Sequence, residues 1–205
     1  MTRLMLVRHG EVDADMSRYW GHTDVPLSVE GLKQAGNLCR RLANEKVDAV
    51  YSSDLRRAVD TAAVIAMPHR LPAVPCPELR EINFGRCEGM TFGEVKEHYP
   101  EAEKLWLGAD PELSFPGGES LSTLAERVEA FAARLRCHPA GTVLVVAHGG
   151  PLRVLICRLT GLDLSCWQQI QIERASLSIM EIDACGRVIH FLNDVSHLQR
   201  RQDIE

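Results

Sequence analysis

The chain of 205 residues predicts a three-layer α/β/α sandwich with a mostly parallel central sheet, built as a single domain over residues 1–205. Two observations indicate this class. Short apolar runs alternate along the chain with segments whose apolar residues recur at helical spacing. The runs at residues 4–7 and 142–147 are also apolar without alternation, which is typical of strands buried on both faces of a parallel sheet.

The first half of the chain predicts two strand–helix units. Residues 4–7 form a strand, and residues 28–42 form a helix because their apolar positions recur at helical spacing behind a serine suited to cap it. Residues 47–51 form the second strand. We expect Ser53 to cap the helix that follows, and we expect that helix to end before Pro68, whose ring cannot continue it.

The second half of the chain contains an expected insertion over about residues 80–119, where glycines, aromatic residues and short helical stretches follow one another. We expect this insertion to cover an active site. The remaining elements are a short strand in the proline-rich residues 71–77, short helices at 91–98 and 101–107, a long helix after residue 120 to about 135, the central strand at 142–147, a helix at 151–159, and a closing hairpin of 176–183 and 187–192 that turns at 184–186.

The composition restricts the classes of partner. The formal net charge is −5 and the chain has no run of Lys or Arg, so we expect neither nucleic acid nor an anionic membrane to bind. No apolar run has the length of a membrane helix, and we expect no signal peptide because the first residues lack a hydrophobic core region. For the chain itself we expect a monomer or a homodimer.

Cysteine and histidine spacing points away from metal chemistry. The seven cysteines are odd in number and include no Cys-x-x-Cys pair, which favours free thiols in the cytoplasm over disulfides or a zinc site. The eight histidines show no His-x-x-x-His spacing. We therefore expect a cytoplasmic protein that uses neither a metal nor another cofactor.

Three predicted strands end in residues that can bind an anion. Arg8 and His9 follow the first strand, Arg57 lies in the helix after the second, and His148 follows the central strand. Ligands of open α/β sheets bind beyond the carboxyl ends of the strands, so we expect these side chains to meet there. Arginine donates two parallel hydrogen bonds to phosphate oxygens, and the sequence therefore predicts a phosphate pocket.

Residues beside these strand ends are candidates for substrate binding. Gly10 and Gly149 would let backbone N–H groups approach a ligand closely, next to a helix N-terminus that favours an anion. Arg18, Gly21 and His22 lie in the loop after His9 and are expected to reach substrate, although an ordinary surface loop is an equally good interpretation of that segment.

Short motifs in a fixed order extend this pattern over nearly the whole chain. They are Arg8-His9-Gly10, Gly21-His22-Thr23-Asp24-Val25-Pro26-Leu27-Ser28, Ser52-Ser53-Asp54-Leu55-Arg56-Arg57-Ala58, Leu79-Arg80-Glu81-Ile82, Gly117-Gly118-Glu119-Ser120 and His148-Gly149. The ordered set resembles the histidine phosphatase superfamily, which has the phosphoglycerate-mutase-like fold. Arg-His-Gly alone would be a weak signal, but the ordered set is specific.

The resemblance implies a role for each residue of the predicted pocket. His9 would attack phosphorus to form a phosphohistidine, and its other ring nitrogen should donate a hydrogen bond to a nearby backbone carbonyl. Arg8, Arg57 and His148 would bind the phosphoryl oxygens. Glu81 matches the family's general acid, which protonates the departing alcohol. Glu78, Glu88 and Glu119 lie in the same part of the chain and leave that assignment open.

The resemblance also leaves the reaction and the substrate open. Many relatives carry a phosphate-binding asparagine shortly after Arg-His-Gly, whereas this chain has Glu11, Asp13 and Asp15, which we expect to face solvent. The compact segment after Glu81 favours a phosphatase of small phosphomonoesters, most similar to the α-ribazole phosphatases of cobalamin biosynthesis. The alternatives are a phosphoglycerate-mutase-type phosphotransferase and a phosphate-ligand sensor without turnover.

Overall fold

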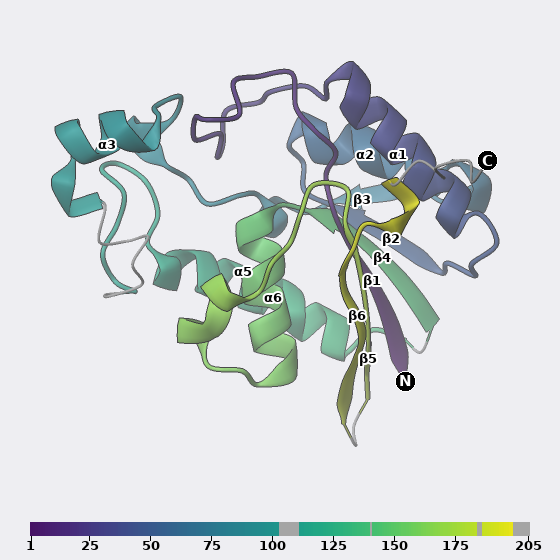
Figure 1. The fold of residues 1–205 in the computed structure, drawn as a ribbon. Helices are drawn as coiled ribbons and strands as arrows, with labels where there is room; N and C mark the ends of the chain where they lie inside the picture. Colours follow the sequence, from purple (N-terminus) through teal and green to yellow (C-terminus); the bar gives the residue numbers. More distant parts are fainter. Residues whose placement is uncertain (103–110, 140, 184–185, 199–205) are drawn as a thin grey trace, which may run out of the picture.

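The computed structural model describes residues 1–102, 111–139, 141–183 and 186–198 (Figure 1). Among these residues, strands form one sheet with the order β3-β2-β4-β1-β5-β6. Their bounds are β1 Thr2–Arg8, β2 Ala49–Ser52, β3 Ala73–Pro75, β4 Gly141–Ala147, β5 Leu177–Ile182 and β6 Arg187–Asp194. Strands β3, β2, β4 and β1 run parallel, whereas β5 and β6 are antiparallel additions at one edge. The sheet is therefore mostly parallel, as the sequence predicts.

Helices cover both faces of this sheet. Helices α1 (Val29–Leu42) and α2 (Arg56–Ala66) pack on one face, and α5 (Leu121–Arg136) and α6 (Gly149–Thr160) pack on the other (Figure 1). The short helix α3 (Phe92–His98) stands away from the sheet. This arrangement confirms the three-layer α/β/α class.

Strand β1 shows why its sequence is apolar without alternation. Leu4 and Leu6 belong to the core under α5 and α6, while Met5 and Val7 belong to the core under α1 and α2. Successive side chains of a strand point to opposite faces, so a strand between two helix layers must be apolar at every position.

The start of α2 differs from the prediction. Ser53 was expected to cap this helix, but the capping position is Leu55, which has no side chain able to accept the bond. The N–H of Arg56 instead donates to Asp24 Oδ1 at 2.7 Å. The capping carboxylate therefore comes from a distant loop, which leaves the Ser53 hydroxyl available for the active site.

The start of α6 also differs from the prediction, whereas α3 agrees with it. Helix α6 begins at Gly149, two residues before its expected start, so its first N–H groups lie directly behind His148. Helix α3 agrees with the prediction at 91–98, because Thr91 and Glu94 form a reciprocal capping box. Most of the helix expected at 101–107, and most of the hairpin turn expected at 184–186, lie outside the described residues.

The described part of the chain holds neither a membrane span nor a metal-ligand cluster. No helix in it is long and apolar enough to cross a membrane. No group of three His, Cys, Asp or Glu side chains in these residues is placed to hold a metal ion. The cysteines that the structure describes are free thiols, as the sequence predicts.

Candidate active site

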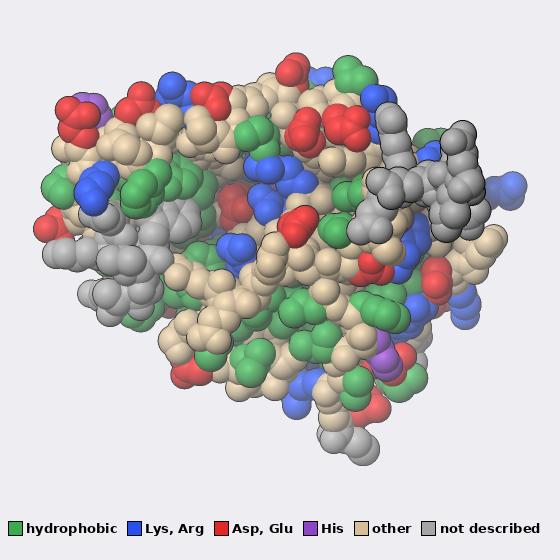
Figure 2. Space-filling view, viewed as in Figure 1, with side chains coloured by type: hydrophobic (Ala, Val, Ile, Leu, Met, Phe, Trp, Pro, Cys, Tyr) green, Lys and Arg blue, Asp and Glu red, His purple; other side chains and the backbone are tan. Residues whose placement is uncertain are grey.

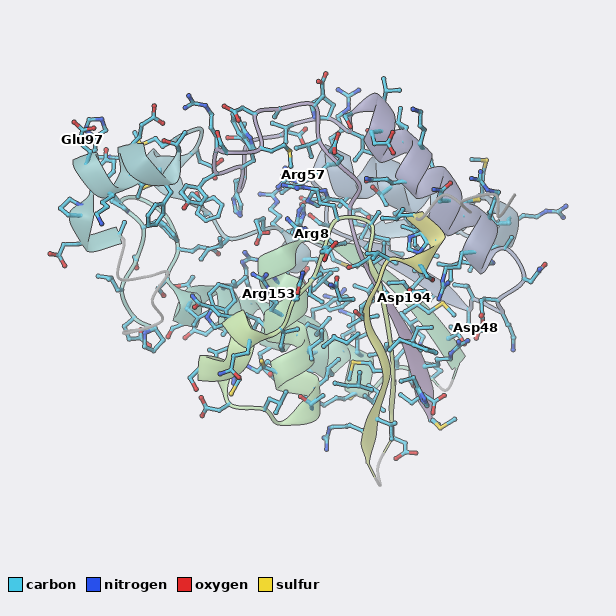
Figure 3. The ribbon with its side chains drawn as sticks, in the orientation of Figure 1. Arg8, Asp48, Arg57, Glu97, Arg153 and Asp194 are labelled. Atoms are coloured by element: carbon cyan, nitrogen blue, oxygen red, sulfur yellow. The ribbon has the colours of Figure 1, made fainter. Side chains whose placement is uncertain are left out.

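The carboxyl ends of β1 and β4 bring the two predicted histidines together. The strands are parallel and in register, with Arg8 beside Ala147, so His9 and His148 leave the sheet at the same edge. Their ring centroids are 4.9 Å apart. Figure 3 shows Arg8 and Arg57 gathered in the same region. The predicted meeting of these side chains is confirmed.

His9 is buried and held in one tautomer. Its Nδ1 lies 2.7 Å from the carbonyl oxygen of Gly10. A carbonyl can only accept, so Nδ1 carries the proton and donates, which leaves a lone pair on Nε2. Burial lowers the pKa of His9 below its usual value, and the positive charges of Arg8 and Arg57 lower it further. The ring is therefore neutral at neutral pH, and the predicted contact with a backbone carbonyl is confirmed.

His148 is also buried, and both of its ring nitrogens have partners. Nδ1 accepts from Arg57 Nε at 3.2 Å, so Nε2 carries the proton and donates to the Ser53 hydroxyl at 2.8 Å. Burial and the charge of Arg57 lower the pKa of His148. It does not line the cavity described below. His148 therefore lies behind Arg57 and positions that guanidinium.

Arg57 is held by the backbone of the loop that follows His9. Although 1% exposed, it donates from one terminal nitrogen to Thr23 O at 2.9 Å and from the other to Gly21 O at 2.6 Å. These bonds fix the plane of the guanidinium in front of His148. The carbonyls also explain how a fully charged group is tolerated at this depth.

Arg8 is less fully satisfied than Arg57. One terminal nitrogen donates to Ile172 O at 2.7 Å, but its Nε is buried and has no partner among the described residues. Burial lowers the pKa of Arg8 to about 10, which keeps it charged at neutral pH. A buried donor without an acceptor indicates a place for a bound anion.

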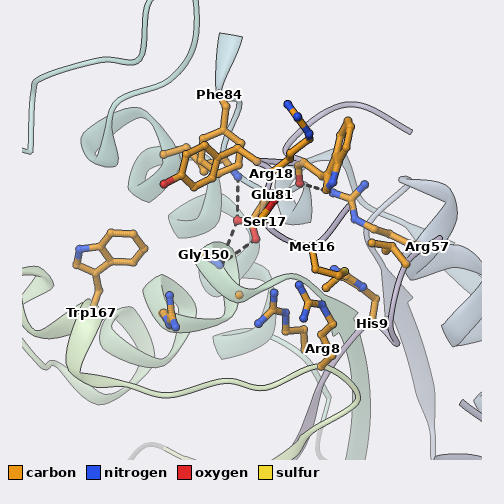
Figure 4. Close-up of a pocket in the computed structure, with 17 residues that line it drawn as sticks. Arg8, His9, Met16, Ser17, Arg18, Arg57, Glu81, Phe84, Gly150 and Trp167 are labelled. Carbon is orange, nitrogen blue, oxygen red and sulfur yellow. Dashed lines mark hydrogen bonds between the residues drawn. The ribbon is translucent and has the colours of Figure 1, made fainter. Parts of the chain in front are cut away.

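These side chains surround a cavity of about 250 Å³ (Figure 4). Arg8, His9 and Arg57 line it together with Glu81. The other lining residues named in the sequence prediction are Arg18 and Gly149. In Figure 2, Lys and Arg side chains gather in the middle of the same face, with acidic side chains around them. An acidic protein thus presents a local positive site.

Glu81 lines this cavity and lies against the N-terminus of α6. Its carboxylate accepts from the N–H of Gly150 at 3.1 Å and from the N–H of Ile82 at 2.9 Å (Figure 4). A Cβ at position 150 would lie 2.3 Å from Glu81 Oε1, so a larger residue there would displace the carboxylate from this position. Glu81 is therefore fixed by backbone donors and faces the phosphate site.

The other candidate acids are occupied elsewhere. Glu119 pairs with Arg127 at 2.7 Å, and Glu78 pairs with a surface arginine. Glu88 accepts the backbone N–H groups of the loop that follows His9. Of these four carboxylates, all in the described part of the chain, Glu81 alone lines the cavity.

Gly10, Gly21 and His22, like His148, were predicted to bind substrate but do not line the cavity, which corrects their assignment. Gly10 is packed against α1, where an added Cβ would lie 2.6 Å from Gly31 O. The N–H groups of Gly21 and His22 donate to Glu88, at 3.0 and 2.9 Å. These three residues hold the loop that follows His9 in place and do not contact the cavity. Their sequence motif signals the turn that holds Arg57, not a contact with substrate.

Comparison with known proteins agrees with this geometry. The family model described as "Histidine phosphatase superfamily (branch 1)" matches residues 4–195. The chain belongs to the histidine phosphatase superfamily. It is 38% identical over 200 residues to Phosphoserine phosphatase 1 of Hydrogenobacter thermophilus, covering 97% of this chain and 95% of that protein.

Two other similar proteins have names that contain a different substrate, α-ribazole phosphate. The adenosylcobalamin/α-ribazole phosphatase of Escherichia coli is 35% identical over 199 residues, covering 90% of this chain and 98% of that protein. A crystal structure described as an Escherichia coli α-ribazole-5′-P phosphatase superposes with a TM-score of 0.87 at 32% identity, covering 94% of this chain and 96% of that one. The chain is thus a histidine-phosphatase-type small-molecule phosphatase.

The acidic residues that follow Arg8-His9-Gly10 in this histidine phosphatase lie outside the cavity. Asp13 and Asp15 are exposed, as predicted, and the Asp15 carboxylate accepts from Ser17 and Arg18. Glu11 is half-buried and accepts from a serine hydroxyl instead of facing solvent freely. None of the three acidic residues lines the described cavity, so they do not repel a phosphate there.

The lining residues of this histidine phosphatase that the sequence analysis missed include Arg153, Trp167 and Arg174. Arg153 could have been found, because it lies one turn after Gly149 and Gly150 on the same helix and so shares their face. Trp167 lies in a short 3-10 helix (Leu164–Gln169) after α6 and Arg174 lies in a turn, and neither is long enough for periodicity to indicate which way a side chain points.

Proposed function

We propose that the protein hydrolyses small phosphomonoesters through a phosphohistidine formed on His9. The observation that carries the proposal is the bond from His9 Nδ1–H to Gly10 O. It leaves the Nε2 lone pair on a neutral ring that lines an arginine-rich cavity. A neutral imidazole held in one tautomer is the form of histidine that can attack phosphorus.

The first step transfers the phosphoryl group to His9. Nε2 attacks phosphorus as the bond to the alcohol oxygen breaks, and Glu81 in its acid form protonates that oxygen. Arg8 and Arg57 bind the non-bridging oxygens, with the unpartnered Nε–H of Arg8 as a donor. Phosphoryl transfer depends mostly on positioning and on stabilising charge in the transition state, which fixed guanidinium groups supply.

The second step returns the site to its starting state. Water attacks phosphorus as the bond to Nε2 breaks, and the Glu81 carboxylate takes a proton from that water. Inorganic phosphate then leaves. Glu81 serves as acid first and as base second, so a single carboxyl group opposite His9 serves both steps.

The neutral histidines make this arrangement electrostatically consistent. His148 accepts a hydrogen bond from Arg57 without adding a third positive charge. The phosphoryl dianion is then balanced by Arg8 and Arg57. The names of the similar proteins supply two substrates to compare, phosphoserine and α-ribazole 5′-phosphate, and the second is the substrate that the sequence motifs favour.

The proposal is tested by phosphate release from a metabolite panel that includes both compounds, with EDTA present. We expect inorganic phosphate to form in EDTA and the His9→Ala variant to release none. Incubation with 3-phosphoglycerate and a trace of the bisphosphate separates the alternatives, because a mutase would yield the isomer in place of free phosphate. Tight binding of phosphorylated ligands without any turnover across the panel would overturn the proposal and favour a sensor.

A further inference from the structure

One wall of the cavity is positively charged beyond the needs of the phosphoryl group. Arg153 and Arg174 line it together with Trp167. The Arg153 guanidinium lies 5.9 Å from the centre of the Trp167 ring, and its Nε donates to Ile170 O at 2.7 Å. Figure 3 shows Arg153 pointing to the same region as Arg8. We call these three residues the Arg153–Arg174 wall.

Among the described residues, no carboxylate is in direct contact with the two arginines of this wall. Neither Arg153 nor Arg174 forms an ion pair in the part of the chain that the structure describes. Arg18, by contrast, also lines the cavity but pairs with Asp15 at 3.1 Å and with Glu94 at 3.0 Å. The protein therefore pairs Arg18 with carboxylates and leaves the guanidinium groups of Arg153 and Arg174 without an ion pair in the described residues.

The wall also contains buried donors without acceptors. Trp167 is 5% exposed, and its indole Nε1–H has no partner among the described residues. The Nε–H of Arg174 is likewise buried and unpartnered there. Native proteins satisfy most buried donors, so two of them beside one cavity indicate an acceptor-rich group of the ligand. The phosphoryl oxygens already have Arg8 and Arg57.

The wall lies within electrostatic reach of the reaction site. The charge of Arg174 lowers the pKa of both His9 and Arg8, and the charge of Arg153 lowers the pKa of Arg8. Like charges at this range repel one another, and their repulsion is relieved when an anion binds among them. Carboxylates offset part of this positive charge from a distance, since Glu81 acts on Arg8 and Arg153 and Glu11 acts on Arg174.

We propose that the Arg153–Arg174 wall binds a carboxylate of the substrate, on the same short carbon skeleton that carries the phosphoester. The inference rests on the proposed function and names its substrate class, the phosphorylated hydroxy or amino acids of a few carbons. A cavity of about 250 Å³ is below the usual range for drug-sized ligands, which agrees with a substrate of this size. A carboxylate accepts from both guanidinium groups and from the indole N–H.

The test compares substrates that differ in this carboxylate. 3-Phosphoglycerate and glycerol 3-phosphate have the same carbon count, with a carboxylate in one and a hydroxymethyl group in the other. Phosphoserine and phosphoethanolamine form a second pair. We expect kcat/KM of wild type to favour the carboxylate in at least one pair by about 30-fold or more, on the scale of a paired charged hydrogen bond. No preference in either pair overturns the inference.

Substitutions in the wall should reduce this preference. We expect Arg174→Gln and Arg153→Gln to lower the ratio of kcat/KM values about tenfold, mainly through KM of the carboxylate substrate, on the scale of one lost charged hydrogen bond. Arg174→Lys keeps the charge and should recover part of the ratio. Trp167→Phe removes the N–H but keeps most of the ring and should lower the ratio by a few-fold. Equal loss on both members of a pair would contradict the proposal.

The matched control is Arg158→Gln, on the same helix but paired at the surface with Glu129. It should leave the ratio and the basal activity unchanged. Each variant is also assayed with p-nitrophenyl phosphate, which has no carboxylate. Hydrolysis of this compound without any carboxylate preference would overturn the subsite and leave the proposed function standing. Absence of hydrolysis in wild type would instead overturn the proposed function.

Discussion

The two sides of the cavity are built in different ways. The side that faces the phosphoryl group comes from the ends of β1 and β4 and from the first turn of α2, which carry His9, His148 and Arg57. The Arg153–Arg174 wall comes from α6, from the short 3-10 helix Leu164–Gln169 and from a turn before β5. Parallel strands must place their carboxyl ends at one edge, so topology dictates the first side and leaves the second side unspecified.

The two sides also differ in how their polar groups are satisfied. Arg57 and His148 form a hydrogen bond with each other. Arg57 also donates to the carbonyl of Gly21, and His148 donates to the hydroxyl of Ser53. Trp167 and Arg174 have buried donors without partners in the described residues. The first side is thus largely organised before any ligand binds, as a site for charge stabilisation should be, with Arg8 Nε as its one unpartnered buried donor in the described residues, while the second side has two.

Among substitutions on the phosphoryl side of the cavity, we expect the largest loss of activity at Arg57. Arg57→Gln removes a fixed donor to the phosphoryl oxygens and should lower kcat/KM by about 10²- to 10³-fold. Its neighbour Arg56 is exposed and forms a surface ion pair with Asp60, so Arg56→Gln should change activity little. Steady-state kinetics of the two variants, with thermal unfolding to verify folding, provides the measurement. Similar losses in both would contradict the distinction.

A selective effect is expected at Glu81. Glu81→Gln cannot protonate a departing oxygen, so hydrolysis of alkyl phosphates should slow by about 10²-fold or more. An aryl phosphate leaves without needing that proton and should be slowed much less. The check is kcat for an alkyl and an aryl phosphate in both proteins. Equal slowing of the two would remove Glu81 from the acid role.

The smallest effect is a shift in pH dependence. The pKa of His9 is lowered by burial and by the charges of Arg8 and Arg57, so the ring takes up a proton only below its usual pKa. Activity should therefore persist as pH falls through about 6.5 and decline at lower pH.

Arg57→Gln separates this titration from that of the substrate. The variant removes one of the positive charges that lower the pKa of His9, so the acid limb of kcat/KM should move to higher pH. The substrate titrates identically in both proteins and cannot cause the difference. An acid limb at the same pH in both would show that the Arg57 charge does not act on His9.

The same contrast explains how much the sequence could predict. The fold class follows from apolar runs such as 4–7, which both helix layers bury. The pairing of His9 with His148 follows from parallel strand ends and is confirmed at 4.9 Å. Both predictions rest on periodicity and topology, which a single sequence displays directly.

Contacts between distant loops could not be predicted in this way. Ser53 was expected to cap α2, yet its hydroxyl bonds to His148, and the capping carboxylate belongs to Asp24. Gly21 was expected at the substrate, yet it packs behind the site because Glu88 holds its N–H. No sequence pattern indicated that Arg174 lines the cavity, because it lies in a turn whose course is set by packing.

The most direct test of the central claim is rapid-quench trapping of the intermediate. With substrate labelled in the phosphoryl group, wild type should acquire acid-labile label that peptide mapping assigns to His9, and the label should decay as inorganic phosphate forms. His9→Ala should acquire none. Turnover by wild type with no label on His9 at any time during the reaction would contradict the account.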